Sequence, residues 1–118
     1  MKIILGKENA ESMRDKYLVL ELDTIQFATD APSITAYCLV EPKALEELTT
    51  MNSFIELHAK LIENYQKKNW KFCSDAIEHL LGKWNGDVDS FYRELLNRIN
   101  NYKSADLPSE WTGVIKKY

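Results

Sequence analysis

The chain has 118 residues and a formal net charge of −3, and hydrophobic residues make up 45% of it, as in an ordinary soluble globular domain. Aromatic residues, 11% of the chain, argue against disorder, and the uncharged apolar runs are too short for a transmembrane helix. Residues 1–51 carry 5 Lys or Arg and 9 Asp or Glu, and residues 52–118 carry 10 and 9, so neither part is basic enough to bind a row of nucleic-acid phosphates.

The N-terminal sequence and the two cysteines indicate the compartment. "MKIILGKENAES" has an apolar run that is too short for a signal sequence, and acidic residues follow it directly. Cys38 and Cys73 belong to no Cys-x-x-Cys motif, so we expect both thiols to be unpaired and buried. The sequence therefore predicts a protein of the cytoplasm. "ILGKEN" has a single glycine and lacks the glycine fingerprint of a nucleotide site, and no cofactor is expected.

Residues 1–51 are expected to form mainly a β hairpin with a short helix. The apolar "MKIIL" is typical of a strand, and "KENAESMRDKY" predicts a short helix from about Glu8 to Lys16. "YLVLELDTIQF" and "SITAYCLVE" are rich in β-branched and aromatic residues, and "ATDAPS" between them is typical of a turn. A loop centred near residue 30 would place Phe27 opposite Ile34.

In this register, one face of the hairpin is the expected core face because its apolar residues are the more continuous. Its members are Leu18, Leu20, Leu22, Tyr37 and Leu39. The other face carries Val19, Glu21, Asp23, Ile25 and Phe27.

Residues 52–102 are expected to be helical because apolar residues recur at helical spacing. After Pro42, "KALEELTTM" first suggests a short helix or helical turn. Three amphipathic helices then follow over about residues 52–67, 70–84 and 88–102, and the short links between them predict antiparallel neighbours. The tail, residues 103–118, is expected to be irregular.

The stretch "HLLGKWNGDVDSFYRELL" contains a corner between two of these helices. Gly82 stands where a left-handed cap would end a helix, "NG" is a turn dipeptide, and Asp87 could cap the next helix. The segment "NGDVD" also has the one-three-five spacing of a calcium loop. Ser90 and Leu96, however, stand where that loop requires glycine and glutamate, so we interpret the stretch as a corner only.

Glu21, Asp23 and His58 are the candidates for a metal or acid–base site. Glu21 and Asp23 share a strand face about 7 Å apart, and two such carboxylates can hold a divalent ion or share a proton. His58 lies on the apolar face of its predicted helix, whereas His79 lies opposite the apolar face of its own predicted helix. The two imidazoles should therefore point in different directions. With no third His or Cys nearby in the sequence, the simpler interpretation is a solvated strand face, a core His58 and a surface His79.

The three tryptophans are expected to seal the small core. If one of them binds a partner instead, Trp111 is the candidate because it lies in the irregular tail.

Two groups of segments resemble known proteins. Within residues 54–84, "LHAKLIENYQKKNWKFCSDAIEHLLGKW" is similar to a tetratricopeptide helical hairpin: Trp70 stands at the turn-flanking aromatic position and Cys73 at the small packing position, whereas Leu61 replaces the usual glycine. "KYLVLELDTIQF", "ITAYCLVE" and "DAIEHLLGKWNGDVDSFY" resemble small uncharacterised proteins of marine phages, particularly those of cyanobacteria, and the likeness spans most of the chain. The first resemblance implies a helical hairpin, and the second implies a bacterial cytoplasm but no activity and no site residues.

Together, these observations predict one α+β domain over residues 1–118, with a small antiparallel sheet of two or three strands near the N-terminus packed against three C-terminal amphipathic helices. We expect a non-enzymatic accessory or interaction protein, encoded by a phage, that binds another protein but neither nucleic acid nor a membrane. Open sheet edges also favour a homodimer. The alternative is a small metal-dependent enzyme or ligand-binding domain that uses Glu21 and Asp23 with His58.

Overall fold

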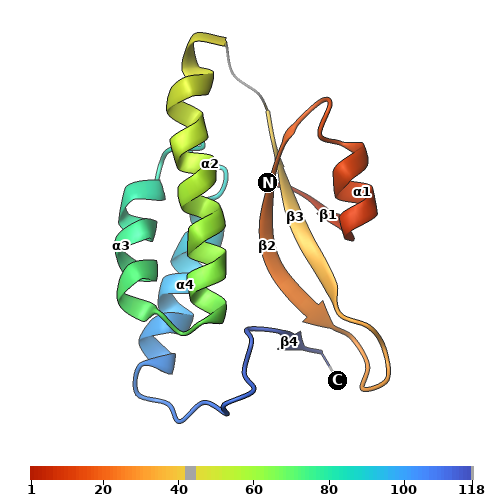
Figure 1. Ribbon diagram of the computed structural model, residues 1–118, viewed down its shortest axis with the longest axis vertical. Helices are drawn as coiled ribbons and strands as arrows, with labels where there is room; N and C mark the ends of the chain where they lie inside the picture. Colours follow the sequence, from red (N-terminus) through yellow and green to blue (C-terminus); the bar gives the residue numbers. More distant parts are fainter. Residues whose placement is uncertain (42–44, 118) are drawn as a thin grey trace.

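A computed structural model describes residues 1–41 and 45–117 as a sheet with helices on both of its faces (Figure 1). The elements in chain order are β1 (Lys2–Leu5), α1 (Lys7–Ser12), β2 (Leu18–Gln26), β3 (Ile34–Val40), α2 (Leu45–Gln66), α3 (Trp70–Leu80), α4 (Asp89–Tyr102) and β4 (Ile115–Lys116). The helices α2, α3 and α4 lie on one side of the sheet, and the short α1 lies on the other (Figure 1). The predicted α+β class is confirmed.

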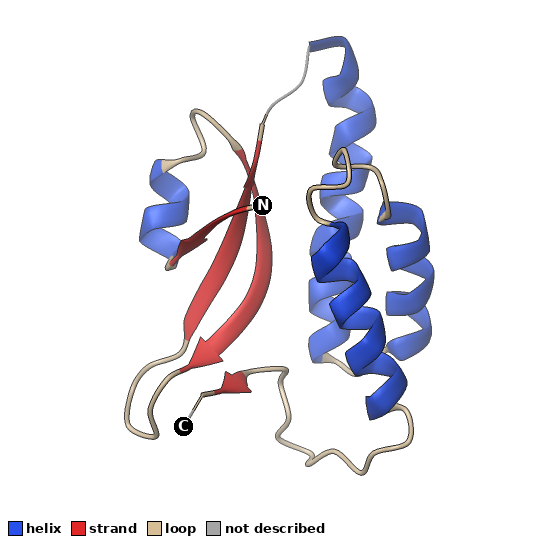
Figure 2. Ribbon diagram, turned by 180° about the vertical axis from the view of Figure 1, so that it is seen from behind, coloured by secondary structure: helices blue, strands red, loops and turns tan. Residues whose placement is uncertain are grey.

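The described residues form a four-stranded sheet in the order β1-β3-β2-β4. Strands β1 and β2 both pair with β3 in the antiparallel sense, whereas β4 pairs in parallel with the end of β2. The sheet is therefore mixed where an antiparallel sheet of two or three strands was predicted, and the fourth strand arises because part of the tail that was expected to be irregular forms β4 (Figure 2). The Lys117 N–H donates a hydrogen bond of 2.8 Å to the Gln26 carbonyl at this junction.

The β2–β3 hairpin forms, but its predicted register is wrong. Ile34 pairs with Ile25 and not with Phe27. The loop is longer than expected, and the Gln26 side chain donates hydrogen bonds to two carbonyl groups within it. Between Glu21 and Thr24 an irregularity changes the register of β2 against β3 a second time, as a β-bulge does, so the residues farther from the loop are paired in another register.

This shift changes which side chains of β3 face the long helices. Leu20 pairs with Cys38, and both are buried in the core. Tyr37 pairs with Glu21 on the opposite face, so the predicted core face, which joined Leu20 to Tyr37 and Leu39, is wrong for β3. A slip of one residue is enough to turn every side chain of a strand to its other face.

The helix α2 is continuous from Leu45 to Gln66, whereas the sequence predicts a short helix followed by a second one. Residues 42–44, where the predicted short helix would begin, lie outside the described residues. The three segments that the sequence predicts as amphipathic helices supply fully buried apolar side chains of α2, α3 and α4, which include Leu61, Ile77, Leu80, Leu95 and Ile99. They form one core with the inner face of β2 and β3.

The corner between α3 and α4 is a turn, as predicted, but its capping differs from the prediction. Gly82, Asn85 and Gly86 all adopt positive φ, a conformation that glycine takes without steric cost. Asp87 makes no side-chain cap for α4. Instead, the Asp89 carboxylate accepts a hydrogen bond of 2.8 Å from the Gly82 N–H and so joins the two helix ends.

Candidate functional site

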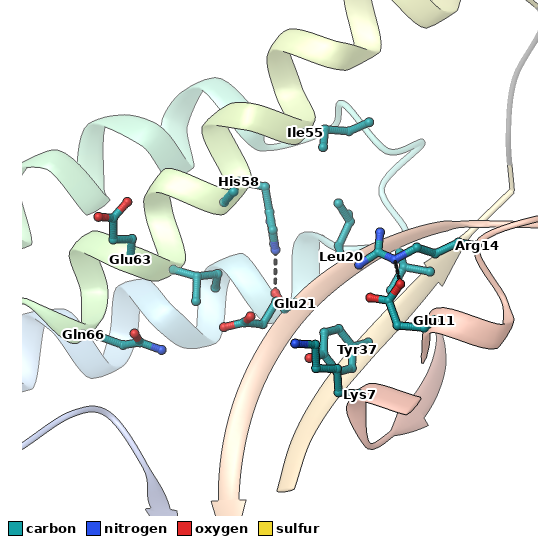
Figure 3. A pocket seen from close by; sticks show the side chains of 13 residues that line it. Lys7, Glu11, Arg14, Leu20, Glu21, Tyr37, Ile55, His58, Glu63 and Gln66 are labelled. Atoms are coloured by element: carbon teal, nitrogen blue, oxygen red, sulfur yellow. Dashed lines mark hydrogen bonds and ion pairs between the residues drawn. The ribbon is translucent and has the colours of Figure 1, made fainter. Parts of the chain in front are cut away.

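A cleft of about 510 Å³ lies between α1, β2 and α2 (Figure 3). The wall formed by α1 and the turn after it carries Lys7, Glu11 and Arg14, and the wall formed by α2 includes the apolar Ile55 and Ile62. Residues of β2 and β3 line the rest of the cleft. Its volume lies within the usual range for ligand sites, roughly 300–1,000 Å³.

Glu21 is a half-buried carboxylate that lines this cleft. No described side chain lies within hydrogen-bond or ion-pair distance of its carboxylate oxygens, and burial raises its pKa above the ordinary value. Its partner across the strand pair is Tyr37, whose pKa is raised first by burial and then by the charge of Glu21. A partly desolvated and uncompensated carboxylate in a cleft is a candidate for a functional group.

The two cations of the α1 wall do not neutralise Glu21. The Arg14 Nε lies 2.9 Å from Oε2 of Glu11, so this guanidinium already has a carboxylate partner. The Lys7 side chain lies beside Tyr37 in Figure 3, and it forms no ion pair within residues 1–41 and 45–117. Glu21 is therefore the cleft carboxylate that has no counter-ion in the described structure.

His58 borders the cleft but is fully engaged inside the protein, with 1% of its surface exposed. Its Nε2 lies 2.6 Å from the Glu21 backbone oxygen, which can only accept, so Nε2 carries the proton (Figure 3). Nδ1 then accepts a hydrogen bond of 2.9 Å from the Tyr92 hydroxyl, which itself accepts one of 2.9 Å from the Trp84 indole N–H. The network is complete for the neutral imidazole, and burial lowers the pKa of His58 although the bond to Glu21 opposes that shift.

The two histidines occupy different environments. His58 lies in the core, as the sequence predicts, and it has two hydrogen-bond partners there. His79 lies exposed on α3. The network joins α2, α4, the corner that precedes α4, and β2, so His58 holds the helical layer against the sheet.

Asp23 pairs with Arg98 of α4 and not with Glu21. The Arg98 Nη1 and Nη2 lie 2.8 and 3.1 Å from the two carboxylate oxygens of Asp23, and its Nε lies 3.3 Å from Oε1 of Glu94. The Asp23 and Arg98 side chains are only 17% and 20% exposed. Burial alone would lower the pKa of Arg98, but the hydrogen bonds and charge of Asp23 raise it above the ordinary value.

Glu21, Asp23 and His58 therefore do not converge on one point. The side chain of Glu21 lines the cleft, Asp23 holds Arg98, and His58 uses both ring nitrogens within the core. Within residues 1–41 and 45–117, no group of three or more His, Cys, Asp or Glu side chains is placed to hold a metal ion. The geometry thus gives little support to the alternative of a metal site made by these three residues.

Trp111, the candidate for partner binding, packs against other aromatic residues of its own chain. Its ring centroid lies 5.5 Å from that of Tyr65, 5.6 Å from that of Trp70 and 5.3 Å from that of Tyr102. These contacts fasten the tail to α2, α3 and α4 and bring β4 to the edge of β2. The position of Trp111 therefore favours a structural role.

The α1 wall of the cleft is not apparent from the sequence. Lys7, Glu11 and Arg14 belong to a polar segment in which only Ala10 is buried, so nothing in the pattern distinguishes them from a solvated face. Strand β1 lies beside β3, and this placement brings α1 to the cleft. No local sequence pattern indicates that α1 lies beside the residues of β2 and α2 that line the cleft.

Comparison of the chain with known protein families, with curated proteins and with solved structures found no match. Within the described residues, every helix is too short or too polar to cross a membrane.

Proposed function

We propose that the protein is a non-enzymatic interaction domain that holds a basic segment of a partner protein in the cleft between α1, β2 and α2. The observation that carries this proposal is the Glu21 carboxylate, which is half-buried in the cleft without a counter-ion among the described residues. A cation that enters the cleft would recover the electrostatic energy that burial of this carboxylate costs.

The apolar lining supports a lysine or arginine side chain as the group that is recognised. Such a side chain has a long apolar stem and a charged tip. Val19, Ile55 and Ile62 offer apolar surface for the stem, and Glu21 offers a carboxylate for the tip. Lys7, which lines the same cleft, can donate hydrogen bonds to backbone carbonyl groups of a bound segment.

A binding role also agrees with the state of the other reactive groups. Both ring nitrogens of His58 are engaged, and burial raises the pKa of both thiols, Cys38 and Cys73, to about 11. Neither thiol is an activated nucleophile in this state. The resemblance to phage proteins suggests a phage or host protein of the bacterial cytoplasm as the partner.

Peptide titration followed by NMR tests this function. The probes are short Ala-Gly peptides whose central residue is arginine, lysine, norleucine or glutamate, added up to about 5 mM so that weak binding is detected. The arginine and lysine peptides should shift the backbone resonances of Val19, Glu21 and Ile62, whereas the norleucine and glutamate peptides should not. Glu21→Gln should weaken binding by at least about tenfold, because it removes the charge but keeps the shape.

Glu78→Gln is the matched control, since Glu78 is an exposed carboxylate on α3 outside the cleft. This variant should bind the arginine peptide as the unmodified protein does. The proposal is overturned if no basic peptide binds, if Glu21→Gln binds equally well, or if butylguanidinium alone binds as tightly as the arginine peptide. The last result would identify the ligand as a small amine or guanidine instead of a protein segment.

A further inference from the structure

The outer edge of the sheet is strand β1, which pairs on one side with β3. Its backbone orientation follows from one hydrogen bond of 2.9 Å, from the Gly6 N–H to the Thr35 carbonyl. Because residues of an antiparallel ladder alternate, Ile4 and Lys2 also turn their backbone groups toward β3, and Leu5 and Ile3 turn theirs outward. Among the described residues, the outward N–H and C=O of Ile3 have no hydrogen-bond partner.

The two residues whose backbone groups turn outward, and Met1 before them, also carry exposed apolar side chains. Met1, Ile3 and Leu5 are 49%, 56% and 44% exposed, although large apolar side chains are usually covered. Ile3 pairs with Cys38, so its side chain lies on the face that carries the long helices, beyond the part that they cover. An edge strand with unpaired backbone groups and an uncovered apolar row is suited to pairing with another strand.

We infer that this edge pairs with β1 of a second copy of the chain, antiparallel about a two-fold axis at Ile3. An antiparallel pair can exchange hydrogen bonds only where both residues turn their backbone groups toward each other, so odd-numbered residues of one copy must face odd-numbered residues of the other. With Ile3 opposite Ile3, Met1 faces Leu5 in both directions. The backbone rule thus places each apolar side chain opposite another apolar side chain.

The charges near β1 are compatible with this pairing. Lys2 lies on the opposite face of the strand, where its Nζ is 3.3 Å from the Tyr17 hydroxyl and 3.7 Å from Glu41. In the proposed register Lys2 faces Ile4, and the two Lys2 residues are offset by about 7 Å along the strands. No like charges are therefore brought directly opposite each other.

The rest of the sheet explains why a second copy, and not an open row of copies, would bind. On the far edge, β4 covers Ile25 and Gln26, and His58 of α2 binds the Glu21 carbonyl. This edge is therefore partly occupied, whereas the outward backbone groups of Ile3 have no partner in the described structure, so the proposed pairing joins like edges and closes as a dimer. The Leu5 carbonyl already accepts a hydrogen bond of 2.9 Å from the Asn9 side chain, so the shared ladder is short and the dimer is weak.

Sedimentation equilibrium from about 10 μM to about 1 mM tests the pairing. The unmodified chain should dimerise reversibly in this range, and Ile3→Glu and Ile3→Lys should each weaken the dimer by at least about tenfold, because like charges meet on the axis. Phe72→Lys is the matched control, since Phe72 is 37% exposed on α3, away from β1, and this change should leave the dimer intact.

A mixture of the two Ile3 variants distinguishes self-pairing from other contacts. In the mixed dimer the introduced carboxylate lies opposite the introduced ammonium group, so mixing should restore association. A monomeric unmodified chain, a dimer that tolerates both Ile3 changes, or variants that do not recover on mixing would each overturn the inference.

Hydrogen exchange of the unmodified chain is a second test that needs no variant. The Ile3 amide should become protected only at high protein concentration, and protection that does not depend on concentration would also overturn the inference.

Discussion

The ring Nε2 of His58 on α2 donates a hydrogen bond of 2.6 Å to the backbone carbonyl of Glu21 on β2. Strand β4 pairs with β2 only at Ile25 and Gln26, so this carbonyl has no strand partner on that edge. A buried carbonyl without a partner is costly, and the imidazole removes that cost. The backbone of Glu21 therefore fixes α2 to the sheet while its side chain lines the cleft.

Tyr92→Phe should lower the free energy of unfolding by about 1–3 kcal/mol, because buried groups lose their hydrogen-bond partner. The change leaves both the Trp84 indole N–H and the His58 Nδ1 without the Tyr92 hydroxyl. Urea denaturation followed by tryptophan fluorescence measures the effect. Tyr17→Phe is the control: it removes an exposed bond to Lys2 and should change stability by less than about 0.5 kcal/mol. Equal effects of the two changes would contradict the buried network.

Mild acid should destabilise the protein through His58. Burial lowers the pKa of this imidazole from the ordinary value of 6.5, so below that pH the unfolded chain takes up a proton that the folded chain does not. The free energy of unfolding should therefore be at its full value above pH 6.5 and decrease below it, by up to about 1.4 kcal/mol per pH unit. Glu21 acts in the opposite sense, because burial raises the pKa of its carboxyl.

Urea denaturation between about pH 7.5 and pH 5 measures this dependence. His58→Gln is the comparison, since it keeps a hydrogen-bonding side chain and removes the titrating group. The variant should be less stable at pH 7.5, and its stability should change less across the window. A variant with the same slope as the unmodified protein would show that another group causes the acid effect.

Asp23→Asn should lower the free energy of unfolding by about 1–3 kcal/mol, because it leaves a largely buried guanidinium with a weaker partner. A double-mutant cycle with Arg98→Met should give a coupling energy above about 1 kcal/mol. The exposed pair of Glu63 and Lys67, whose charged atoms lie 2.9 Å apart, is the control, and its cycle should give less than about 0.5 kcal/mol. Similar coupling energies for the two pairs would contradict a structural role for Arg98.

The parts of the fold that depend on local periodicity could be predicted from the sequence. Apolar spacing identified the faces of α2, α3 and α4, and β-branched segments identified the hairpin. The register could not be predicted, because it depends on the irregularity within residues 21–24 and on the loop bonds of Gln26. Strand β4 has only two residues and exists because the aromatic contacts of Trp111 bring the tail to β2.

The candidate site was predictable only in part, for a similar reason. The position of His58 in an apolar arc indicated a core residue, whereas its partners Tyr92 and Glu21 come from distant segments. Glu21 and Asp23 share a strand face by simple alternation, but Asp23 is held by Arg98, which lies 75 residues away in the chain. Long-range pairing thus decides which carboxylate remains available to a ligand.

Glu21→Gln should raise the free energy of unfolding at neutral pH and weaken binding of the arginine peptide. Burial raises the pKa of this carboxyl, so its charged form is less favourable in the folded chain than in the unfolded chain. Because the group is half-exposed, the gain should be small, from a few tenths to about 1 kcal/mol. It should be present at neutral pH and vanish below the ordinary pKa of 4.5, where the carboxyl is protonated in both states.

Thermal and urea denaturation at about pH 7 and about pH 4, with Glu78→Gln as the control, measure this gain. The substitution keeps the backbone carbonyl that His58 binds, so it changes the cleft without removing the contact between α2 and β2. A loss of stability at neutral pH would mean that the carboxylate has a stabilising partner, and the argument for a ligand cation would fail. A more stable protein that binds the peptide less well would separate the two roles of Glu21, because its backbone would then support the fold and its side chain would serve the partner.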